Sequence, residues 1–385
     1  MNTKEKALAL HDEWRGKIEI ACRCPMETAE DLTMAYTPGV AEPCLKIAAD
    51  TSLSYIYTRR WNTVAVITDG TAVLGLGDIG AEAAMPVMEG KCALFKSLAG
   101  VDAIPLCVRS KDVDEIVRTI ELLCGSFGGI NLEDISAPRC FEIERRLKQV
   151  CDIPVFHDDQ HGTAVVVVAA LNNALKLAGK KAEDIRVAIS GAGASAQAVS
   201  QLLTSFGVQD ILHSDSKGAI YDGRPGMDPE RAGLARVTNR RMIKGGLADI
   251  MKGADVFIGL SAAGLVNADM VRGMAESPIV FSMANPTPEI MPDEAFAAGA
   301  FIVGTGRSDF ANQINNVLAF PGIFRGALDA RASDINEEMK LAAAMALADF
   351  ISEDELRPER ILPAVLQPGV SDAVARAVSR AAIRG

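Results

Sequence analysis

The stretch Ile185-Arg-Val-Ala-Ile-Ser-Gly-Ala-Gly-Ala-Ser-Ala196 decides the fold of this chain of 385 residues. Its apolar first half, Ile185 to Ser190, predicts a buried strand. Its second half spells G-x-G-x-x-A and leads into a helical pattern from Ser195 to Phe206. Glycines at such a strand-to-helix turn allow the backbone to approach a pyrophosphate, and the N-terminus of the helix attracts its charge. The stretch therefore predicts a dinucleotide-binding fold.

The strand predicted next, Asp210 to His213, leads to an acid whose position bears on the cofactor. Asp215 comes just over twenty residues after Gly191, where a carboxylate can accept hydrogen bonds from an adenosine ribose. The carboxylate favours NAD because it repels the 2′-phosphate of NADP, whereas Ser216-Lys217 could accept that phosphate. We expect NAD or NADP as the cofactor, with NAD preferred.

Three more apolar runs follow, and each ends in a polar or glycine-rich loop. They are Asp255 to Leu260, Ile279 to Ser282 and Phe301 to Val303. Repeated α/β units of this kind fold into a doubly wound parallel sheet, which binds ligands at the carboxyl ends of its strands. The fold class is thus α/β, with a Rossmann-type domain predicted over residues 156–330. We expect an α/β N-terminal catalytic domain over 1–155, and a helical tail over 331–385 that packs back on the N-terminal half.

Two pairs of adjacent carboxylates follow strand-like runs in the N-terminal part. Glu133-Asp134 comes after the run from Gly128, and Asp158-Asp159 comes after Ile153 to Phe156. One amphipathic helix, predicted over Pro138 to Val150, separates the pairs, so the two strand ends can converge. Carboxylate oxygens are the ligands that Mg²⁺ and Mn²⁺ prefer, and the pairs predict such a metal site. The alternative for the first pair is a helix N-cap.

Two histidines flank the second acid pair and raise the question of zinc. His157 and His161 are four residues apart, a spacing that puts two ligands on one face of a helix. The glutamate of an H-E-x-x-H motif is absent, however, and Gly162 is expected to interrupt a helix here. The histidines are therefore interpreted as residues that do not bind a metal.

Three further polar features each allow a functional and a structural interpretation. Lys91 lies among apolar residues in a helix predicted over Ala83 to Leu98, and it is either a solvated surface lysine or, if buried, a candidate base. Tyr36 precedes a Pro-Gly loop and is either a fixed phenol donor or a packed aromatic residue. The pair Asn315-Asn316 can hold a carboxylate by hydrogen bonds or can end a helix.

A turn signal and a second glycine motif lie between the tyrosine and the lysine. Val64 to Thr68 and Ala72 to Leu76 have the pattern of short strands, and Asp69-Gly70 between them predicts a hairpin. Gly75-Leu-Gly-Asp-Ile-Gly80 spells G-x-G-x-x-G, but no strand-turn-helix unit frames it. This second motif is therefore a weak sign of nucleotide binding.

The composition argues against several classes of protein. A formal charge of −11 and the lack of any run of Lys or Arg argue against a nucleic-acid partner. No apolar run approaches the ~20 residues that span a bilayer, and the N-terminus lacks the apolar core of a signal peptide. Eight cysteines without a Cys-x-x-Cys pair indicate reduced thiols and no zinc ribbon. We therefore expect a cytoplasmic protein that binds neither membrane nor nucleic acid.

Taken in order, these motifs resemble those of the malic enzymes of the short bacterial kind, over nearly the whole chain. The resemblance is carried by Tyr36-Thr-Pro-Gly-Val, Thr68-Asp-Gly, Gly75-Leu-Gly-Asp-Ile-Gly, Glu89-Gly-Lys91, Asn131-Leu-Glu-Asp-Ile, His157-Asp-Asp-Gln-His-Gly-Thr, the Gly191 turn, Ala284-Asn-Pro-Thr-Pro-Glu and Asn315-Asn316-Val. Each motif is weak alone, and their joint order makes the resemblance specific. It implies NAD(P)- and metal-dependent oxidative decarboxylation of L-malate to pyruvate and CO₂, by a homodimer.

The resemblance also implies roles for particular residues. The metal ligands would be Glu133, Asp134 and Asp159. Lys91 would be the base that removes the C2 hydroxyl proton, with Asp158 beside it, and Tyr36 would be the acid that protonates C3 of the enol. The residues at the dinucleotide would be Gly191, Gly193, Ala194, Ser195, Ala196, Asp215 and Asn285. Those at the substrate would be Asn285 and Asn315.

Two alternatives and one departure accompany the resemblance. The nearest alternative is a malolactic enzyme, which carries the same motifs, retains NAD and releases lactate. The other is a non-catalytic dinucleotide-binding regulator whose acid pairs cap helices. The departure concerns the substrate carboxylate, which many larger family members bind with an arginine just after the Thr-Asp-Gly turn. This chain has Thr71-Ala72 there, so Asn285, Asn315 or a basic residue elsewhere must bind the substrate carboxylate instead.

Overall fold

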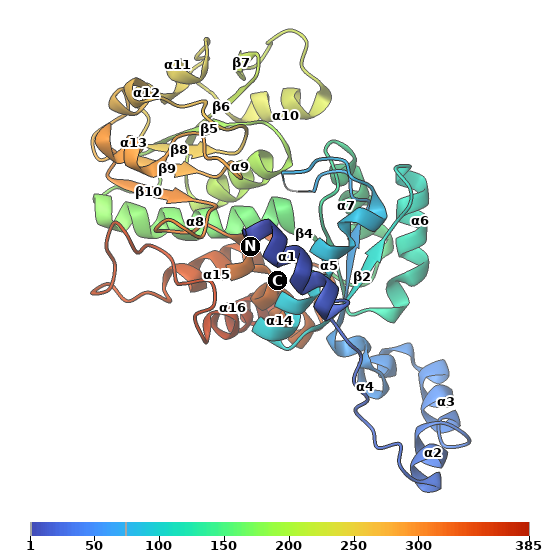
Figure 1. The fold of residues 1–385 in the computed structure, drawn as a ribbon. Coiled ribbons are helices and arrows are strands. Elements are labelled where there is room, and N and C mark those ends of the chain that lie inside the picture. Colours follow the sequence, from blue (N-terminus) through green and yellow to red (C-terminus); the bar gives the residue numbers. More distant parts are fainter. Residues whose placement is uncertain (1, 74, 385) are drawn as a thin grey trace.

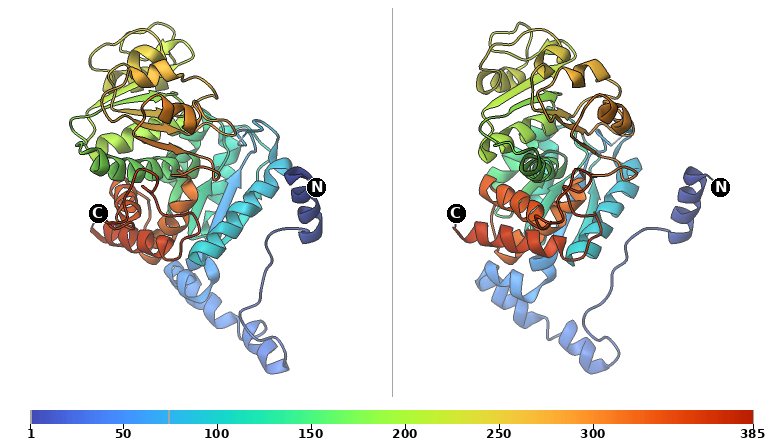
Figure 2. Two further views of the ribbon diagram at one scale, coloured as in Figure 1. Left: turned by 60° about the vertical axis from the view of Figure 1, so that its left-hand side comes forward. Right: turned by 90° about the vertical axis from the view of Figure 1, so that its left-hand side faces the viewer.

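The computed structural model describes residues 2–73 and 75–384 of the chain. Two α/β domains, each built on its own sheet, lie next to each other, and a segment near the N-terminus projects from this body (Figures 1 and 2). The C-terminal helices lie against the body at the side of the first domain (Figure 1). The predicted α/β fold class with a Rossmann-type sheet is confirmed.

The first domain has a four-stranded parallel sheet in the order β2-β1-β3-β4. Its strands are β1 (Thr63–Thr68), β2 (Asp102–Cys107), β3 (Gly129–Leu132) and β4 (Val155–His157), and its helices are α5 (Ala81–Ala99), α6 (Val113–Leu123) and α7 (Arg139–Val150). Side chains of β1 alternate between the two faces of the sheet. Val64 and Val66 belong to the core shared with α5, whereas Ala65 and Ile67 pack with α6 and α7. Helices therefore cover both faces, and the carboxyl ends of the strands stay open.

The hairpin predicted at Asp69-Gly70 is wrong. Strand β1 pairs in parallel with β2 on one side and β3 on the other, which leaves no edge for an antiparallel neighbour. Gly70 adopts a φ of 70°, and its carbonyl accepts the N–H groups of Ile79 and Gly80 at 3.0 and 3.1 Å. The chain thus closes into a loop before α5. Of the second strand predicted there, residue 74 lies outside the described residues, and Val73 forms only an isolated bridge with Gly77.

The second domain has a six-stranded sheet in the order β10-β9-β8-β5-β6-β7, parallel except for β7. The strands are β5 (Arg186–Ser190), β6 (Asp210–Asp215), β7 (Gly218–Ala219), β8 (Val256–Gly259), β9 (Ile279–Ser282) and β10 (Ile302–Thr305); the helices are α9 (Ala194–Phe206), α10 (Pro229–Val237), α11 (Leu247–Met251), α12 (Ala268–Arg272) and α13 (Pro292–Ala297). Val187 and Ile189 face the core that contains α9, whereas Ala188 faces α11 to α13. The sheet is therefore doubly wound, as predicted.

Helix α8 (Asp158–Ala178) follows β4 directly and forms the centre of the molecule. Residues 164–171 are at most 1% exposed, because the helix packs against α9 and the C-terminal helices. Sequence reasoning expected Gly162 to interrupt a helix, but α8 continues through it. A Cβ at Gly162 would lie 1.8 Å from Asp158 Oδ1, so the glycine makes room for that carboxylate. The helix is long and apolar enough to cross a membrane, but 67% of its apolar window is buried in the protein, as expected of a core helix.

The C-terminal helices α14 (Phe320–Asp329), α15 (Glu337–Ala348) and α16 (Val370–Arg384) pack on both domains. The ring of Phe95 in α5 lies 4.7 and 5.3 Å from the rings of Phe320 and Phe324 in α14, measured between centroids. Helix α15 packs on α8 and α9, and α16 packs on α14 and α15. The C-terminal segment thus joins the two sheets into one body.

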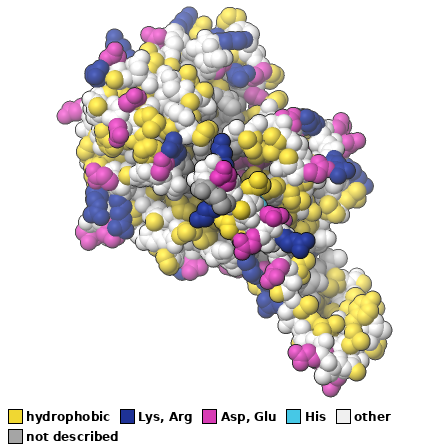
Figure 3. Space-filling model, viewed as in Figure 1, with side chains coloured by type: hydrophobic (Ala, Val, Ile, Leu, Met, Phe, Trp, Pro, Cys, Tyr) yellow, Lys and Arg dark blue, Asp and Glu magenta, His cyan; other side chains and the backbone are white. Residues whose placement is uncertain are grey.

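The N-terminal segment contributes little to this core. It contains α1 (Thr3–Trp14), α2 (Ala29–Ala35), α3 (Ala41–Ala49) and α4 (Ser54–Tyr57), and none of their described residues is buried. Helices α2 and α3 project from the body (Figures 1 and 2), and we call residues 18–57 the extension. Hydrophobic side chains gather over its outer end (Figure 3). Met34 and Leu45, for example, are 66% and 64% exposed.

Candidate active site

A cavity of about 940 Å³ opens where the two domains meet. Its lining includes Trp14, Lys17, Ala72, Lys91, Glu133, Asp134, His157, Asp159, Gly193, Ala194, Ser195, Ala196, Leu260 and Asn316. Most of these residues come from α5, from the carboxyl ends of strands in both sheets, and from the N-termini of α8 and α9, whereas Trp14 and Lys17 come from α1 and the residues after it. Residues predicted separately for metal binding, proton transfer and dinucleotide binding therefore share one space.

Lys91 is held in α5 with its ammonium group between two carboxylates. Its Nζ lies 2.5 Å from Asp158 Oδ2, 2.9 Å from Glu133 Oε1 and 4.1 Å from the ring centroid of Phe320. The side chain is 8% exposed, so Lys91 is not a surface lysine. Burial alone would lower its pKa, as sequence reasoning expected, but the charges of Asp158 and Glu133 raise the pKa above its ordinary value. Lys91 is therefore protonated in this arrangement.

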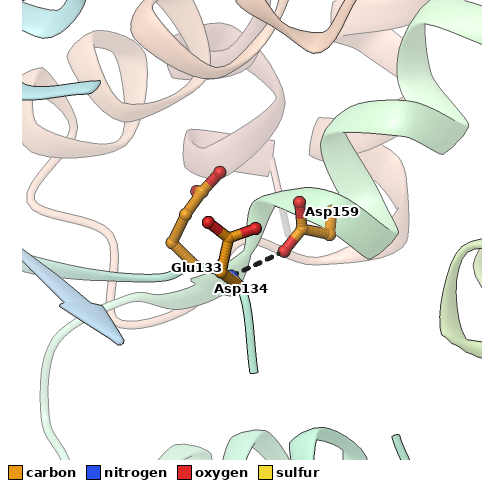
Figure 4. A group of neighbouring side chains, drawn as sticks. All are labelled: Glu133, Asp134 and Asp159. Atoms are coloured by element: carbon orange, nitrogen blue, oxygen red, sulfur yellow. Dashed lines mark hydrogen bonds between the residues drawn. The ribbon is translucent and has the colours of Figure 1, made fainter. Parts of the chain in front are cut away.

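Glu133, Asp134 and Asp159 form the predicted acid cluster, with one ligand atom of each within 4.8 Å of the others. Figure 4 shows their carboxylates at the start of α8, where the backbone N–H of Asp134 donates to Asp159 Oδ2 at 2.9 Å. Buried Asp134 Oδ2 has no hydrogen-bond partner among the described residues. Burial raises the pKa of Glu133 to about 7 and of Asp134 to about 8, and raises that of Asp159. An oxygen-only set of crowded carboxylates fits a hard divalent cation.

The alternative role of the first acid pair, as a helix N-cap, is not observed. Helix α7 begins at Arg139 after Pro138, which makes no capping hydrogen bond, and Glu133 instead contacts Lys91 and Asn131. Asp134 adopts a φ of 54°, in the left-handed region that costs energy for a residue other than glycine. The backbone is therefore strained where it presents this carboxylate to the cluster.

Asp158 is fully buried beside Lys91. Its Oδ2 accepts from Lys91 and from Asn316 Nδ2, the latter at 2.7 Å, whereas its Oδ1 has no partner among the described residues. Burial, with a contribution from the charge of Glu133, raises the pKa of Asp158 to about 7. Because Asp158 begins α8, the partial positive charge of the helix N-terminus favours its ionised form.

The two asparagines of the pair have different roles, which sequence reasoning missed. Asn315 Oδ1 accepts the N–H of Val317 at 3.0 Å and so caps the short 3₁₀ helix η4 (Asn316–Leu318), while Asn316 lines the cavity and contacts Asp158. The first residue of such a pair is the natural cap when an apolar turn follows it, and that rule could have singled out Asn316. Asn285, on the loop after β9, is exposed and is not part of the described cavity lining.

Neither histidine of the second acid pair belongs to the acid cluster. His161 Nε2 lies 2.8 and 3.0 Å from the two oxygens of Glu144, which ties α8 to α7. His157 is 1% exposed, and burial lowers its pKa to about 4, so it is neutral. Among residues 2–73 and 75–384, the one group of three or more His, Cys, Asp or Glu side chains with metal-ligand spacing is the acid cluster. The interpretation of the histidines as non-ligands agrees with this geometry.

The glycine turn has the predicted strand-turn-helix context. Gly191 has a φ of 122°, and a Cβ there would lie 2.7 Å from the carbonyl oxygen of Leu260, so only glycine fits. Residues 193–196 line the cavity at the N-terminus of α9. Ser195 Oγ donates to the carbonyl of Asp159 at 2.7 Å, which joins the turn to the acid cluster. Asp215 ends β6 outside the described lining, and it pairs with Arg224.

Two other predicted features lie differently from expectation. Tyr36 follows α2 on the extension, is 65% exposed and is not among the described residues that line the cavity. Ala72, at the place of the missing arginine, lines the cavity without a charge. Lys17 does line the cavity, with its Nζ 2.7 Å from the carbonyl oxygen of Pro86. Lys17 and Lys91 are the two positively charged side chains in the described lining.

Two family models together match most of the chain. The model described as malic enzyme, N-terminal domain, matches residues 15–148, and the model described as malic enzyme, NAD binding domain, matches residues 160–383. The break between them contains β4 and the first two residues of α8. The first match therefore includes strands β1 to β3 of the four-stranded sheet, and the second includes all strands of the six-stranded sheet.

Individual relatives are similar over the full chain. The bifunctional malic/malolactic enzyme of Bacillus subtilis is 58% identical over 384 residues, which cover 100% of this chain and 94% of the relative. The NAD-dependent malic enzyme of Geobacillus stearothermophilus is 54% identical over 100% of this chain and 80% of its own length. The crystal structure of the NAD-dependent malic enzyme of Thermotoga maritima superposes with a TM-score of 0.94 at 46% identity, covering 97% of this chain and 98% of that one.

Proposed function

Because the chain belongs to the malic enzyme family, we propose that it converts L-malate to pyruvate and CO₂, with a nicotinamide dinucleotide as oxidant and Mg²⁺ or Mn²⁺ as metal. The observation that carries this proposal is the position of Lys91, between Asp158 and Glu133 in the cavity that the glycine turn also lines. A buried lysine, a carboxylate cluster and a dinucleotide-binding turn meet there. This combination suits oxidation of a hydroxyl group next to a carboxylate.

Lys91 is the residue that we assign to the proton of the C2 hydroxyl. A dinucleotide held at the glycine turn would supply the acceptor for the hydride from C2. The charges of Asp158 and Glu133 raise the pKa of Lys91 in this structure. A cation held by the acid cluster would oppose these charges, which would favour the neutral lysine that can act as a base. Asp158 then keeps the protonated lysine paired and in position, and Asn316 orients Asp158.

Glu133, Asp134 and Asp159 are the residues that would hold the divalent cation. Two observations support this assignment: Asp134 Oδ2 has no hydrogen-bond partner in the described part of the chain, and the pKa values of the cluster are raised. A positive charge would relieve both. Mg²⁺ or Mn²⁺ held by these residues would supply Lewis-acid chemistry for the loss of CO₂. Lys17 is our candidate for the substrate carboxylate in place of the missing arginine.

Tyr36 is assigned to the protonation of C3, within a homodimer in which it acts on the partner's substrate. Helix α2, which Tyr36 follows, projects from the body of its own chain (Figure 2). Ile20, Met34 and Leu45 on the same extension are 93%, 66% and 64% exposed, and such apolar surface is usually covered by a partner. A second copy that receives the extension would bury these side chains and gain the phenol.

Subunit mixing tests the shared site. Lys91→Ala and Tyr36→Phe are each expected to inactivate a homodimer, and mixing the two variants restores turnover if Tyr36 acts across the interface. A hybrid dimer then contains one site with both native residues. Light scattering gives the oligomeric state independently. A monomer, or hybrids that stay inactive after proven subunit exchange, contradicts the shared site and leaves the reaction itself open.

Initial rates decide the reaction. L-Malate and Mn²⁺ are supplied with NAD⁺ and NADP⁺ side by side, and reduced cofactor, pyruvate and CO₂ are measured. We expect turnover that EDTA abolishes and that Lys91→Ala lowers by about a thousandfold. The control is dinucleotide binding, which Lys91→Ala should leave unchanged. Binding without metal-dependent turnover would instead favour a non-catalytic dinucleotide-binding regulator.

Malolactic activity is the second candidate, because the relative that is 58% identical is named a bifunctional malic/malolactic enzyme. The two activities differ in whether reduced cofactor leaves the enzyme. We expect pyruvate and reduced cofactor in equal amounts. Lactate without net reduced cofactor would replace the first candidate by the second.

A further inference from the structure

Asp215 ends β6 directly beside the glycine turn. The N–H of Gly191 donates to the carbonyl of Ser214 at 2.8 Å, and His213 Nδ1 lies 3.0 Å from the carbonyl oxygen of Gly191. In a Rossmann-type sheet this strand end faces the adenosine ribose of the dinucleotide. A free carboxylate here binds the ribose hydroxyls of NAD and repels the 2′-phosphate of NADP, which is the preference that sequence reasoning expected.

The carboxylate of Asp215 is not free. Its Oδ1 accepts from the N–H of Lys217 at 2.8 Å and from Arg224 Nη1 at 2.9 Å. Its Oδ2 accepts from Arg224 Nη2, and Arg231 Nε lies 3.4 Å away. The side chains of Asp215 and Arg224 are 11% and 8% exposed, so water screens this bidentate pair only weakly. The protein itself therefore occupies the acceptor sites that a ribose would use.

Arg224 is fixed by more than the carboxylate. Its Nη1 also lies 3.0 and 3.3 Å from the carbonyl oxygens of Gly218 and Ala219, on the short strand β7 that pairs with β6. Its buried Nε has no hydrogen-bond partner among the described residues. Arg224 is therefore held from two sides, by the carboxylate of Asp215 and by the carbonyl oxygens of β7.

The second arginine is the more accessible of the two. Arg231 is 40% exposed and is shared between Asp215 and Asp228, the N-cap of α10. Although burial raises the pKa of Asp215, the hydrogen bonds from Arg224 and Lys217 and the charges of Arg224 and Arg231 hold the pKa below its ordinary value. Asp215 is thus ionised and paired with arginine.

We propose that Arg224 and Arg231 neutralise Asp215, so that the adenosine-ribose subsite accepts a 2′-phosphate and the enzyme uses NADP⁺ as well as NAD⁺. Arg224 cancels the repulsion that Asp215 would exert, and Arg231 can contact the phosphate, for which a guanidinium group is well suited. The inference rests on the proposed function for its kinetic readouts and on the dinucleotide fold alone for its binding readouts.

The test combines ligand binding with cofactor kinetics on the full chain. Calorimetry with 2′,5′-ADP and 5′-AMP should show the 2′-phosphorylated ligand bound at least as tightly by the unaltered enzyme. Arg224→Gln should lower the ratio of kcat/KM for NADP⁺ to that for NAD⁺ by about tenfold or more, and Arg231→Gln by a smaller factor. Asp215→Asn should raise the same ratio by about tenfold.

Arg241→Gln is the matched control, because Arg241 Nε lies 3.1 Å from Asp210 at the opposite end of β6. Its ratios should equal those of the unaltered enzyme. Arg224→Gln can also disturb the β6–β7 turn. The inference is therefore judged on the cofactor ratios of Arg231→Gln, which changes an exposed residue, and of Asp215→Asn, where the ratio should rise. Tighter binding of 5′-AMP by tenfold or more, about 1.4 kcal/mol, or unchanged ratios in both variants, overturns the inference. Loss of malate turnover with the binding preference intact would remove the proposed function and leave this inference standing.

Discussion

Two carboxylate sites at strand ends of this enzyme have opposite charge balances. In the described part of the chain, Lys91 is the only lysine or arginine that forms an ion pair with Glu133 or Asp158 of the acidic site. At the end of β6, by contrast, the single carboxylate of Asp215 lies beside two arginines, Arg224 and Arg231. Burial, with the charge of Asp159, raises the pKa of Glu133 to about 7. At Asp215 burial also raises the pKa, but the hydrogen bonds and charges of its partners hold the pKa below its ordinary value. The surplus of carboxylates at the first site suits a divalent cation, whereas the acid at the second site is already offset by arginine.

The largest expected effect is on Mn²⁺ affinity, when one carboxylate charge is removed from the acid cluster and, as a comparison, from the end of β6. Asp159→Asn should weaken Mn²⁺ binding by more than about a hundredfold, because a cluster ligand loses its charge. Asp215→Asn is the matched control and should leave Mn²⁺ affinity unchanged, since its carboxylate is already paired within the protein. Electron paramagnetic resonance of free Mn²⁺ measures both. Equal affinities in the two variants would show that the acid cluster is not the metal site.

The next largest effect is expected from filling the space beside Asp158, which should change both stability and kcat. Gly162→Ala places a Cβ 1.8 Å from Asp158 Oδ1, within a helix that cannot shift easily. Overpacking of this kind should lower the free energy of unfolding by about 1–3 kcal/mol and should also displace the partner of Lys91, so kcat falls. Gly233→Ala in α10 is the control, because a Cβ there meets nothing within 4 Å, and a helical Gly→Ala change in open space should stabilise. Chemical denaturation of both variants measures the difference.

Substitutions of the two asparagines are expected to affect different properties, catalysis for Asn316 and stability for Asn315. Asn316→Ala removes the hydrogen bond to Asp158 and should lower kcat by about tenfold with little change in stability. Asn315→Ala removes a cap and should cost about 1 kcal/mol of stability, and we expect a smaller change in kcat. Steady-state kinetics and thermal unfolding of the pair check this. The reverse assignment would restore the substrate-binding role that the resemblance implied for Asn315.

The smallest effect is the pH dependence of metal stabilisation. Without metal, the folded-state pKa of Glu133 is about 7 and that of Asp134 about 8, above ordinary values of about 4. The folded state thus binds these protons more tightly than the unfolded state, and the free energy of unfolding falls as pH rises from about 4 to about 8. Mn²⁺ competes with the same protons, so the rise in Tm that Mn²⁺ produces should be larger near pH 8 than near pH 6. Thermal unfolding with Mn²⁺ or EDTA tests this, and a pH-independent rise would contradict it.

Local patterns in the sequence were sufficient for the doubly wound sheet and for the two acid pairs. The choice of Glu133, Asp134 and Asp159 among the four acids came from the family resemblance. The apolar run and glycines from Ile185 to Ala196 encode a strand, a turn and a helix within twelve consecutive residues, and the structure follows them. The acid pairs were predictable because parallel strands bring their carboxyl ends to one edge. Burial of Lys91, by contrast, needed the family resemblance, since its neighbours alone also allowed a surface lysine.

The remaining features depend on contacts between residues that are distant in sequence. Asn316 reaches Asp158 across 158 residues, and Gly162 is tolerated in α8 because those two side chains occupy the space beside it. The acid at the end of β6 was visible in the sequence, but its pairing with Arg224 depends on how the chain folds back after β7. Periodicity and turn chemistry report only on neighbours along the chain. Charge balance, side-chain direction and the projection of Tyr36 away from its own body are set by packing, and only the tertiary structure decided them.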